Sequence, residues 1–276
     1  MACGNNHESS NSETFTFVDD YGVSCKVPKN PQRIVSLSPA VTEILFALGA
    51  ENLLVGRTEF CNFPPQVADI ENVGGISNLN VEKVISLQPD LVIAGSMVPE
   101  KTSKLIGKAG IPVACVIEKK NFDGLFENIT KIGLLANKVS SAKSLNDSLK
   151  NELSKISLKN TTDTPSVYYV VGYGKSGNFT AGGNTFINDI LRKAGTRNIA
   201  ENIKGWDFSL EALLATDPDY IIIRKEDAKN FSQTEPYTQL SAVKNHKVIP
   251  IESAYLDLQV PRNIEGLIFI YNQTHK

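Results

Sequence analysis

Two glutamates, Glu82 and Glu211, occupy the same place in two copies of one sequence pattern. The first copy, which starts at Leu79, reads LNVEKVISLQPDLVIA, and the second, which starts at Phe208, reads FSLEALLATDPDYIII. The copies align without a gap and share the glutamate, the Pro-Asp pair and the apolar positions. A carboxylate repeated in this way is a candidate for binding a positively charged partner.

Each copy predicts a short helix followed by a buried strand. Asn80 and Ser209 are suitable N-caps, and a glutamate in the first helical turn interacts favourably with the helix dipole by about 0.3–1 kcal/mol. Pro-Asp then ends the helix and begins the strand. A helix-start role therefore explains each glutamate alone. It does not explain the duplication, which predicts two equivalent lobes that form a clamp, each with one carboxylate at a related place.

A second group of side chains could surround a large, flat ligand, because such a ligand needs apolar and aromatic walls with a few polar groups. The group lies in loops that follow predicted strands, where α/β sheets usually bind ligands. It comprises Phe60, Ile76, Met97, Tyr173, Trp206, Tyr255 and Arg262. Packing within a lobe is the alternative for each aromatic residue. Trp206 is the strongest candidate, since it is the only tryptophan and lies in a Gly-flanked polar loop just before the second copy.

The elements that must position these residues follow an α/β pattern. FTFVDDYGVSCKV, from Phe15, predicts a β-hairpin, and Ser38-Pro39 predicts an N-cap and the first position of a helix. Strands and helices then alternate, which predicts a parallel sheet covered on both faces. Residues 122–158 have helical periodicity, and the alternation resumes at Ser166.

The predicted fold class is α/β, with two α/β lobes that have mostly parallel sheets, are joined by a single long helix and hold a ligand cleft between them. The predicted boundaries are a tether over 1–13, an N-terminal lobe over 14–138, an interlobe helix over 139–159 and a C-terminal lobe over 160–276.

The first residues suggest lipidation. Ala2-Cys3-Gly4 resembles the end of a bacterial lipobox, in which the cysteine thiol receives diacylglycerol, and the polar stretch that follows would be a flexible tether. The charged and apolar parts of a signal peptide are not in the sequence, and we expect that they were removed. A chance cysteine in a disordered tail is the alternative. The other cysteines, Cys25, Cys61 and Cys115, allow at most one internal disulfide and fit no zinc spacing, which favours small buried thiols.

Composition argues against several classes of function. A net charge of −2 provides no basic surface for nucleic acid, and no apolar run reaches the roughly 18 residues that span a bilayer. Three histidines are too few for a Ser/His/Asp or HExxH arrangement or for a zinc or manganese receptor. An α/β enzyme with a nucleotide-type loop at 172–177 is the alternative, because GYGKSG matches GxGxxG after a strand. No helix follows at once, so we predict no catalytic residue, metal or cofactor.

Four segments together resemble a known family. They read RIVSLSPAVTEILFALGA, VGRTEFCNFPPQV, VGGISNLNVEKVISLQPDLVIAG and WDFSLEALLATDPDYIII, in this order. They are similar to class III periplasmic binding proteins, the cobalamin, haem and ferric-siderophore receptors of type II ABC importers, and the similarity runs from about Thr14 to Glu265. The resemblance implies a bacterial receptor in the periplasm or at the cell surface, anchored by a lipid on Cys3. It also implies that Glu82 and Glu211 pair with arginines of an ABC permease, whose partner ATPase powers transport.

The resemblance also orders the possible ligands. Cobalamin-binding members have an aromatic contact at the place of Phe60, but this chain has Ile76 and Gly95 where they have tryptophans. We rank a corrinoid first, with haem or a ferric siderophore as the alternative. Tyr173 and Tyr255 are possible iron ligands, whereas no histidine falls in a predicted ligand loop. Arg262, like Arg57, could bind an anionic group.

Overall fold

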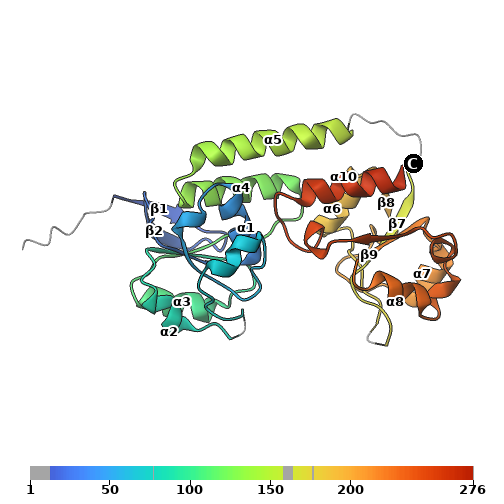
Figure 1. Cartoon of the computed structure of the whole chain (residues 1–276), viewed down its shortest axis with the longest axis horizontal. Helices are drawn as coiled ribbons and strands as arrows, with labels where there is room; N and C mark the ends of the chain where they lie inside the picture. Colours follow the sequence, from blue (N-terminus) through green and yellow to red (C-terminus); the bar gives the residue numbers. More distant parts are fainter. Residues whose placement is uncertain (1–12, 77, 158–163, 176, 276) are drawn as a thin grey trace, which may run out of the picture. The chain divides into compact units, whose positions relative to one another are not determined.

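The structure is a computed structural model that describes residues 13–76, 78–157, 164–175 and 177–275. Cys3 and nearly all of the predicted tether lie outside the described residues. Figure 1 shows the chain coloured along its sequence. The chain forms two compact units, each described here by itself. Unit 1 contains the described residues up to Ile117 together with Thr130–Ala142, and unit 2 contains Glu118–Ile129 and the described residues from Lys143 onward.

Unit 1 begins with the predicted hairpin, in which β1 (Thr14–Val18) pairs antiparallel with β2 (Ser24–Pro28). A four-stranded parallel sheet follows, in the order β4-β3-β5-β6. The remaining elements of unit 1 are β3 (Ile34–Leu37), α1 (Pro39–Ala47), η1 (Glu51–Leu53), β4 (Leu54–Arg57), η2 (Pro65–Asp69), α2 (Val81–Ser86), β5 (Leu91–Ala94), α3 (Glu100–Lys108) and β6 (Val113–Cys115). Parallel strands need crossovers, and α1, α2 and α3 provide them.

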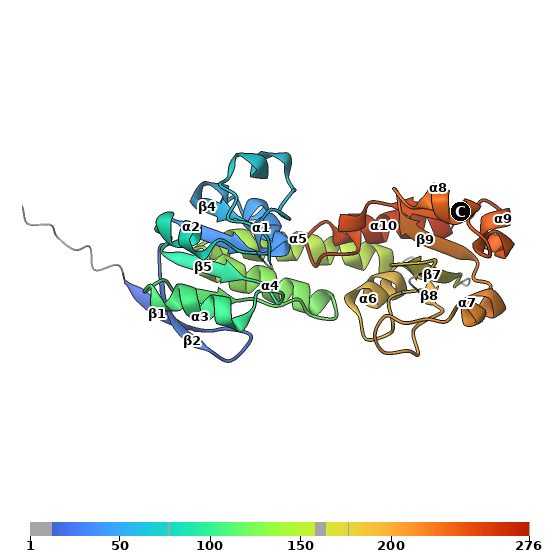
Figure 2. The same cartoon turned by 90° about the horizontal axis from the view of Figure 1, so that it is seen from below.

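The sheet of unit 1 is buried on both faces, as its continuous apolar strands predict. Alternate residues pack on α2 and α3 in one cluster that contains Val35, Leu37, Val92, Ala94, Val84 and Ile106. The intervening residues Ile34, Leu91 and Ile93 are also fully buried. Because strand side chains alternate between faces, burial of both sets means that both faces are covered. Figure 2 shows α2 and α3 beside β5.

Unit 2 repeats this plan. Its parallel sheet has the order β10-β9-β7-β8, so β7 and β9 are central as β3 and β5 are in unit 1. Its elements are β7 (Ser166–Val170), α6 (Phe186–Lys193), β8 (Arg197–Asn198), α7 (Leu210–Thr216), β9 (Tyr220–Arg224), α8 (Ala228–Gln233), η3 (Tyr237–Gln239), α9 (Ser241–Lys244), β10 (Val248–Ile251), η4 (Ser253–Tyr255) and α10 (Asn263–Thr274). Leu213, Ile221 and Ile223 occupy its core at the repeat positions of Val84, Val92 and Ala94.

The sequence repeat is therefore a structural repeat. Asp90 accepts hydrogen bonds from the backbone N–H groups of Gln32 and Arg33, just before β3, at 2.7 and 3.1 Å. Its counterpart Asp219 accepts from the N–H and hydroxyl of Ser166, the first residue of β7, at 2.8 and 2.6 Å. In both units the aspartate of the Pro-Asp turn thus fixes the start of the neighbouring central strand.

Two helices link the units along the chain. They are α4 (Phe122–Leu135) and α5 (Val139–Ser157), and each contributes residues to both units. The helical periodicity predicted over 122–158 is confirmed. α5 begins at Val139 and is described as far as Ser157, and both the single interlobe helix over 139–159 and the lobe boundaries stay predictions. The two-lobed α/β class with parallel sheets is confirmed.

Candidate functional site

The candidate ligand residues of unit 1 lie in loops at the carboxyl edge of its sheet. Phe60 follows β4, in a turn closed by the Cys61 N–H, which donates to the Thr58 carbonyl at 3.1 Å. Met97 follows β5. The two side chains are 53% and 65% exposed, although both are large and apolar. This edge therefore presents apolar surface that the unit itself does not cover.

A buried polar cluster holds the turn that carries Phe60. The Cys61 thiol is 2% exposed and lies 3.2 Å from the Thr42 hydroxyl and 3.3 Å from the Thr58 hydroxyl. Thr42, on α1, also donates to the Ser36 hydroxyl on β3 at 2.8 Å. Among the described residues Cys61 and Cys115 are free, buried thiols, and Cys25 is a free, half-buried one. The expectation of small packed thiols is confirmed for Cys61 and Cys115.

Ile76 lies in the next loop of the same edge and is half-buried. Its loop is tied to the turn of Phe60, because the Glu59 N–H donates to the Gly74 carbonyl at 3.0 Å. The Asn78 side chain accepts from the Gly75 N–H at 3.0 Å. The Phe60 and Ile76 loops are therefore fixed to one another by backbone contacts, while Met97 belongs to a separate loop.

Trp206 lies in the connection between β8 and α7 in unit 2, and its side chain is 45% exposed. Its backbone is held firmly, since the Thr180 N–H donates to the Trp206 carbonyl at 2.7 Å and the Gly182 N–H donates to the Gly205 carbonyl at 2.9 Å. The next residue, Asp207, forms a bridge with Phe179. A half-exposed indole on a fixed backbone is suited to stacking on a ligand at low entropic cost.

Tyr255 and Arg262 belong to the loop after β10. Tyr255 packs against α10 at Gly266, where an added Cβ would lie 2.7 Å from the Tyr255 Cβ. Its hydroxyl donates to Glu265 at 3.2 Å, and burial together with this carboxylate raises the pKa of Tyr255. Arg262 is half-buried at the N-cap position of α10, and its positive charge partly offsets this rise in the pKa of Tyr255. The two predicted residues are therefore neighbours.

The loop from Ser253 to Asn263 is anchored by residues that the sequence did not single out. Asp257 accepts from the Tyr169 hydroxyl at 2.6 Å and from Arg224 Nε at 2.9 Å. Burial and the Asp257 carboxylate raise the pKa of Tyr169, whose side chain is fully buried in β7. Asn263, also fully buried, donates to the carbonyls of Tyr255 and Leu258, each at 2.8 Å. These contacts fix a long loop that has little secondary structure of its own.

Tyr173 is positioned differently, because its ring packs on the core of unit 2. It makes edge contacts with Phe231 and Tyr237 at centroid distances of 5.2 and 5.7 Å, and its hydroxyl accepts from Asn230 at 2.7 Å. The Gly-rich loop that contains Tyr173 follows β7, and a bridge between Gly172 and Phe179 joins its two ends. The next helix, α6, begins only at Phe186. The described residues of this loop therefore form no helix N-terminus that could hold a phosphate.

Glu82 and Glu211 lie in the first turns of α2 and α7, and both are exposed. The predicted caps are confirmed, because Asn80 accepts from the Lys83 N–H at 2.9 Å and Ser209 accepts from the Ala212 N–H at 3.1 Å. Each helix leads into the amino end of a parallel strand and therefore runs back from the carboxyl edge of the sheet to its amino edge. Both helices thus begin at the carboxyl edge. In each unit the glutamate and the candidate ligand loops therefore lie at the same edge.

In the part of the chain that the structure describes, no group of three or more His, Cys, Asp and Glu side chains could hold a metal ion. His246 precedes β10, at the opposite edge of the sheet, and the ring of His275 stacks on Tyr271 at a centroid distance of 4.5 Å. None of the described helices is both long enough and apolar enough to cross a membrane.

Comparison with known proteins gives the family. The family model described as "Periplasmic binding protein" matches residues 34–255. A Bacillus subtilis (strain 168) protein named "Uncharacterized ABC transporter substrate-binding lipoprotein YvrC" is 33% identical over 96% of this chain and 89% of its own length. A "Cobalamin-binding protein" of Halobacterium salinarum is 27% identical over 93% of this chain and 73% of its own length.

The solved structures show the same fold. The periplasmic haem-binding protein RhuT of Roseiflexus sp. RS-1 superposes with a TM-score of 0.78 at 25% identity, covering 88% of this chain and 98% of that chain. The family resemblance seen in the sequence is confirmed. The chain belongs to the periplasmic binding protein family, the extracytoplasmic substrate-binding proteins of ABC transporters.

Proposed function

We propose that this chain captures a corrinoid outside the cytoplasm and delivers it to the permease of an ABC importer, which a partner ATPase drives. The observation that carries the proposal is the exposed apolar surface at the carboxyl edge of each sheet, formed by Phe60 and Met97 in unit 1 and by Trp206 in unit 2. A corrinoid is large and flat and needs such walls. The similarity to a protein named as cobalamin-binding supports this choice.

Docking to the permease is assigned to Glu82 and Glu211. Each is an exposed carboxylate in the first turn of a capped helix, at the edge that also carries the ligand loops of its unit. Paired negative charges suit a partner with two basic patches, and such charges mainly set register and association rate. We also propose that a lipid on Cys3 anchors the chain to the membrane, in line with the lipoprotein name of the Bacillus relative.

Haem or a ferric siderophore is the second candidate, supported by the likeness to RhuT. Haem iron is often held by a protein His or Tyr. The ring of Tyr173 packs on Phe231 and Tyr237 in the core of unit 2, which limits its use as a ligand. The raised pKa of Tyr255 opposes the phenolate that would bind iron. These observations favour the corrinoid.

Titration of the purified chain with cyanocobalamin, haemin and a panel of ferric siderophores tests the proposal. Calorimetry measures affinity, and the fluorescence of the single tryptophan reports contact with Trp206. We expect cyanocobalamin to bind tightest and to quench the fluorescence. Tighter binding of haemin or of a siderophore would select the second candidate, and binding of none at high micromolar concentration would contradict both. The visible spectrum of the protein from its native host provides an independent check.

A further inference from the structure

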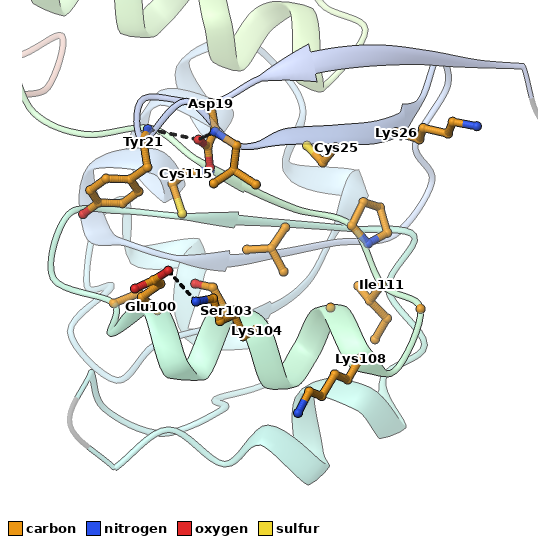
Figure 3. A pocket seen from close by; sticks show the side chains of 16 residues that line it. Asp19, Tyr21, Cys25, Lys26, Glu100, Ser103, Lys104, Lys108, Ile111 and Cys115 are labelled. Carbon is orange, nitrogen blue, oxygen red and sulfur yellow. Dashed lines mark hydrogen bonds and ion pairs between the residues drawn. The ribbon is translucent and has the colours of Figure 1, made fainter.

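A cavity of about 980 Å³ lies in unit 1 between the β1–β2 hairpin, α3 and the edge strand β6. Figure 3 shows the side chains that line it. None of the candidate ligand or docking residues is among them. The volume is at the upper end of the ~300–1,000 Å³ typical of small-molecule pockets. This cavity is therefore large enough for a ligand of its own.

The walls of the cavity favour hydrocarbon. Val23, Val98, Ile111 and Val113 line it, and Val23 is 55% exposed. The one carboxylate deep in the wall, Asp19, already accepts from three backbone N–H groups, those of Tyr21, Val23 and Cys115, at 3.0, 2.8 and 3.2 Å. Burial first, and then Asp19, raises the pKa of Cys115 to about 11, so this thiol stays uncharged at neutral pH. The lining thus offers a ligand apolar contact and few hydrogen bonds.

Gly107 marks a place where the helix wall of the cavity has room for a side chain. It lies inside α3, where glycine destabilises a helix relative to alanine. A Cβ added at Gly107 would meet no atom within 4 Å, and its φ is not in the left-handed region. Gly110, in contrast, has a φ of +83°, which explains glycine there by the backbone alone. Neither backbone nor packing requires Gly107, so position 107 is a place where a larger side chain can be introduced to fill the cavity.

Charge indicates which end of a ligand would lie at the opening. Lys26 on β2 and Lys108 on α3 are attached at the same end of the cavity as Ile111, and in Figure 3 their ammonium groups point away from the cavity in opposite directions. Among the described residues neither lysine has an ion pair, whereas Lys104 pairs with Glu100 at 2.7 Å. We propose that this cavity binds a long-chain fatty acid, with the acyl chain along α3 and β6 and the carboxylate at the end where the exposed side chains of Lys26 and Lys108 can turn toward it.

Binding of a fluorescent polyene fatty acid to the purified full-length chain, competed by palmitate and by hexadecanol, tests the proposal. We expect one saturable site, displaced by palmitate at lower concentration than by hexadecanol. Gly107→Phe fills the cavity and should weaken binding by at least about tenfold. Gly107→Ala, the matched control, adds one methyl group in open space and should change affinity less than about threefold. Lys26→Gln combined with Lys108→Gln should weaken binding of palmitate and leave hexadecanol unchanged.

Several results would overturn the proposal. They are absence of saturable binding, binding that neither Gly107→Phe nor the double lysine variant alters, and equal competition by palmitate and hexadecanol, which would indicate an uncharged ligand. Circular dichroism checks that Gly107→Phe folds. If Gly107→Phe does not fold, the double lysine variant and the comparison of palmitate with hexadecanol still test the proposal. The variants should leave corrinoid titrations unchanged, so that either proposal can fail without the other.

Discussion

Replacing Trp206 with alanine removes the largest exposed side chain in the candidate ligand loops. A tryptophan side chain can bury ~150–250 Å², and 45% of Trp206 is exposed. A ligand that covers the ring therefore removes on the order of 100 Å² from water, worth about 2 kcal/mol at ~25 cal/mol per Å². The expected loss of affinity is roughly 30-fold.

Calorimetric titration of the wild type and of Trp206→Ala with cyanocobalamin measures this loss. Stability should change little, because Thr180 bonds to the backbone of residue 206 rather than to its side chain. Trp206→Phe keeps an aromatic ring and should recover most of the affinity. Leu134→Ala is the control, since Leu134 is similarly exposed, at 43%, but lies on α4 rather than in a ligand loop. An unchanged affinity in Trp206→Ala would refute the stacking role, even if the chain binds a corrinoid.

Three further outcomes are expected. The double variant Glu82→Ala/Glu211→Ala should lose uptake in a reconstituted transporter and keep its ligand affinity. The control variant Glu51→Ala should transport normally. Normal uptake by the double variant would mean that the two glutamates serve only to start their helices. Asp257→Ala should lower the free energy of unfolding in urea by ~1–3 kcal/mol, because it removes the acceptor of a buried tyrosine hydroxyl; no loss would show that the contact is dispensable. Hydrogen bonds from the first residue of β7 lower the pKa of Asp219, so its contribution to stability is present above its ordinary pKa and lost as the pH falls through the lowered one. Asp219→Asn should therefore flatten the acid limb of a urea-unfolding profile between about pH 5 and pH 2, and an unchanged slope would exclude this role.

The sequence predicted the central strands well because their burial leaves a direct pattern. β5 and β7 are buried along their whole length and read as continuous apolar runs. The caps Asn80 and Ser209 were predictable because the capping interaction involves residues three apart. Ser38 has the N-cap position before Pro39, but its side chain makes no capping hydrogen bond, so only half of that prediction is correct.

The elements that the sequence did not predict lack such local patterns. α8 and α9 have six and four residues, too few for a helical period to emerge. α10 has an apolar run from Leu267 to Tyr271, so its apolar residues are not confined to one stripe.

Much of the candidate site could not have been derived from local sequence. The contact of Asp257 with Tyr169 joins residues that are 88 positions apart, and the contact of Asp257 with Arg224 joins residues 33 apart. Only the fold brings them together. The cavity beside α3 is also a property of the fold, because it lies between a hairpin and a helix that are far apart along the chain. Which loops carry aromatic residues was, in contrast, predictable from the strands that precede them.

The arrangement of the two sheets along the chain has a consequence for folding. All strands of unit 1 lie before Ile117, and those of the unit 2 sheet lie between Ser166 and Ile251. A chain that crosses a membrane with its N-terminus first therefore completes one sheet before any strand of the other emerges. Strand exchange between two sheets of the same topology is a hazard for such a repeat, and this order of emergence limits it. The helix packing of unit 1 also needs Thr130–Ala142, so a chain that has emerged only as far as Ile117 has the strands of unit 1 without all of the helices that cover them.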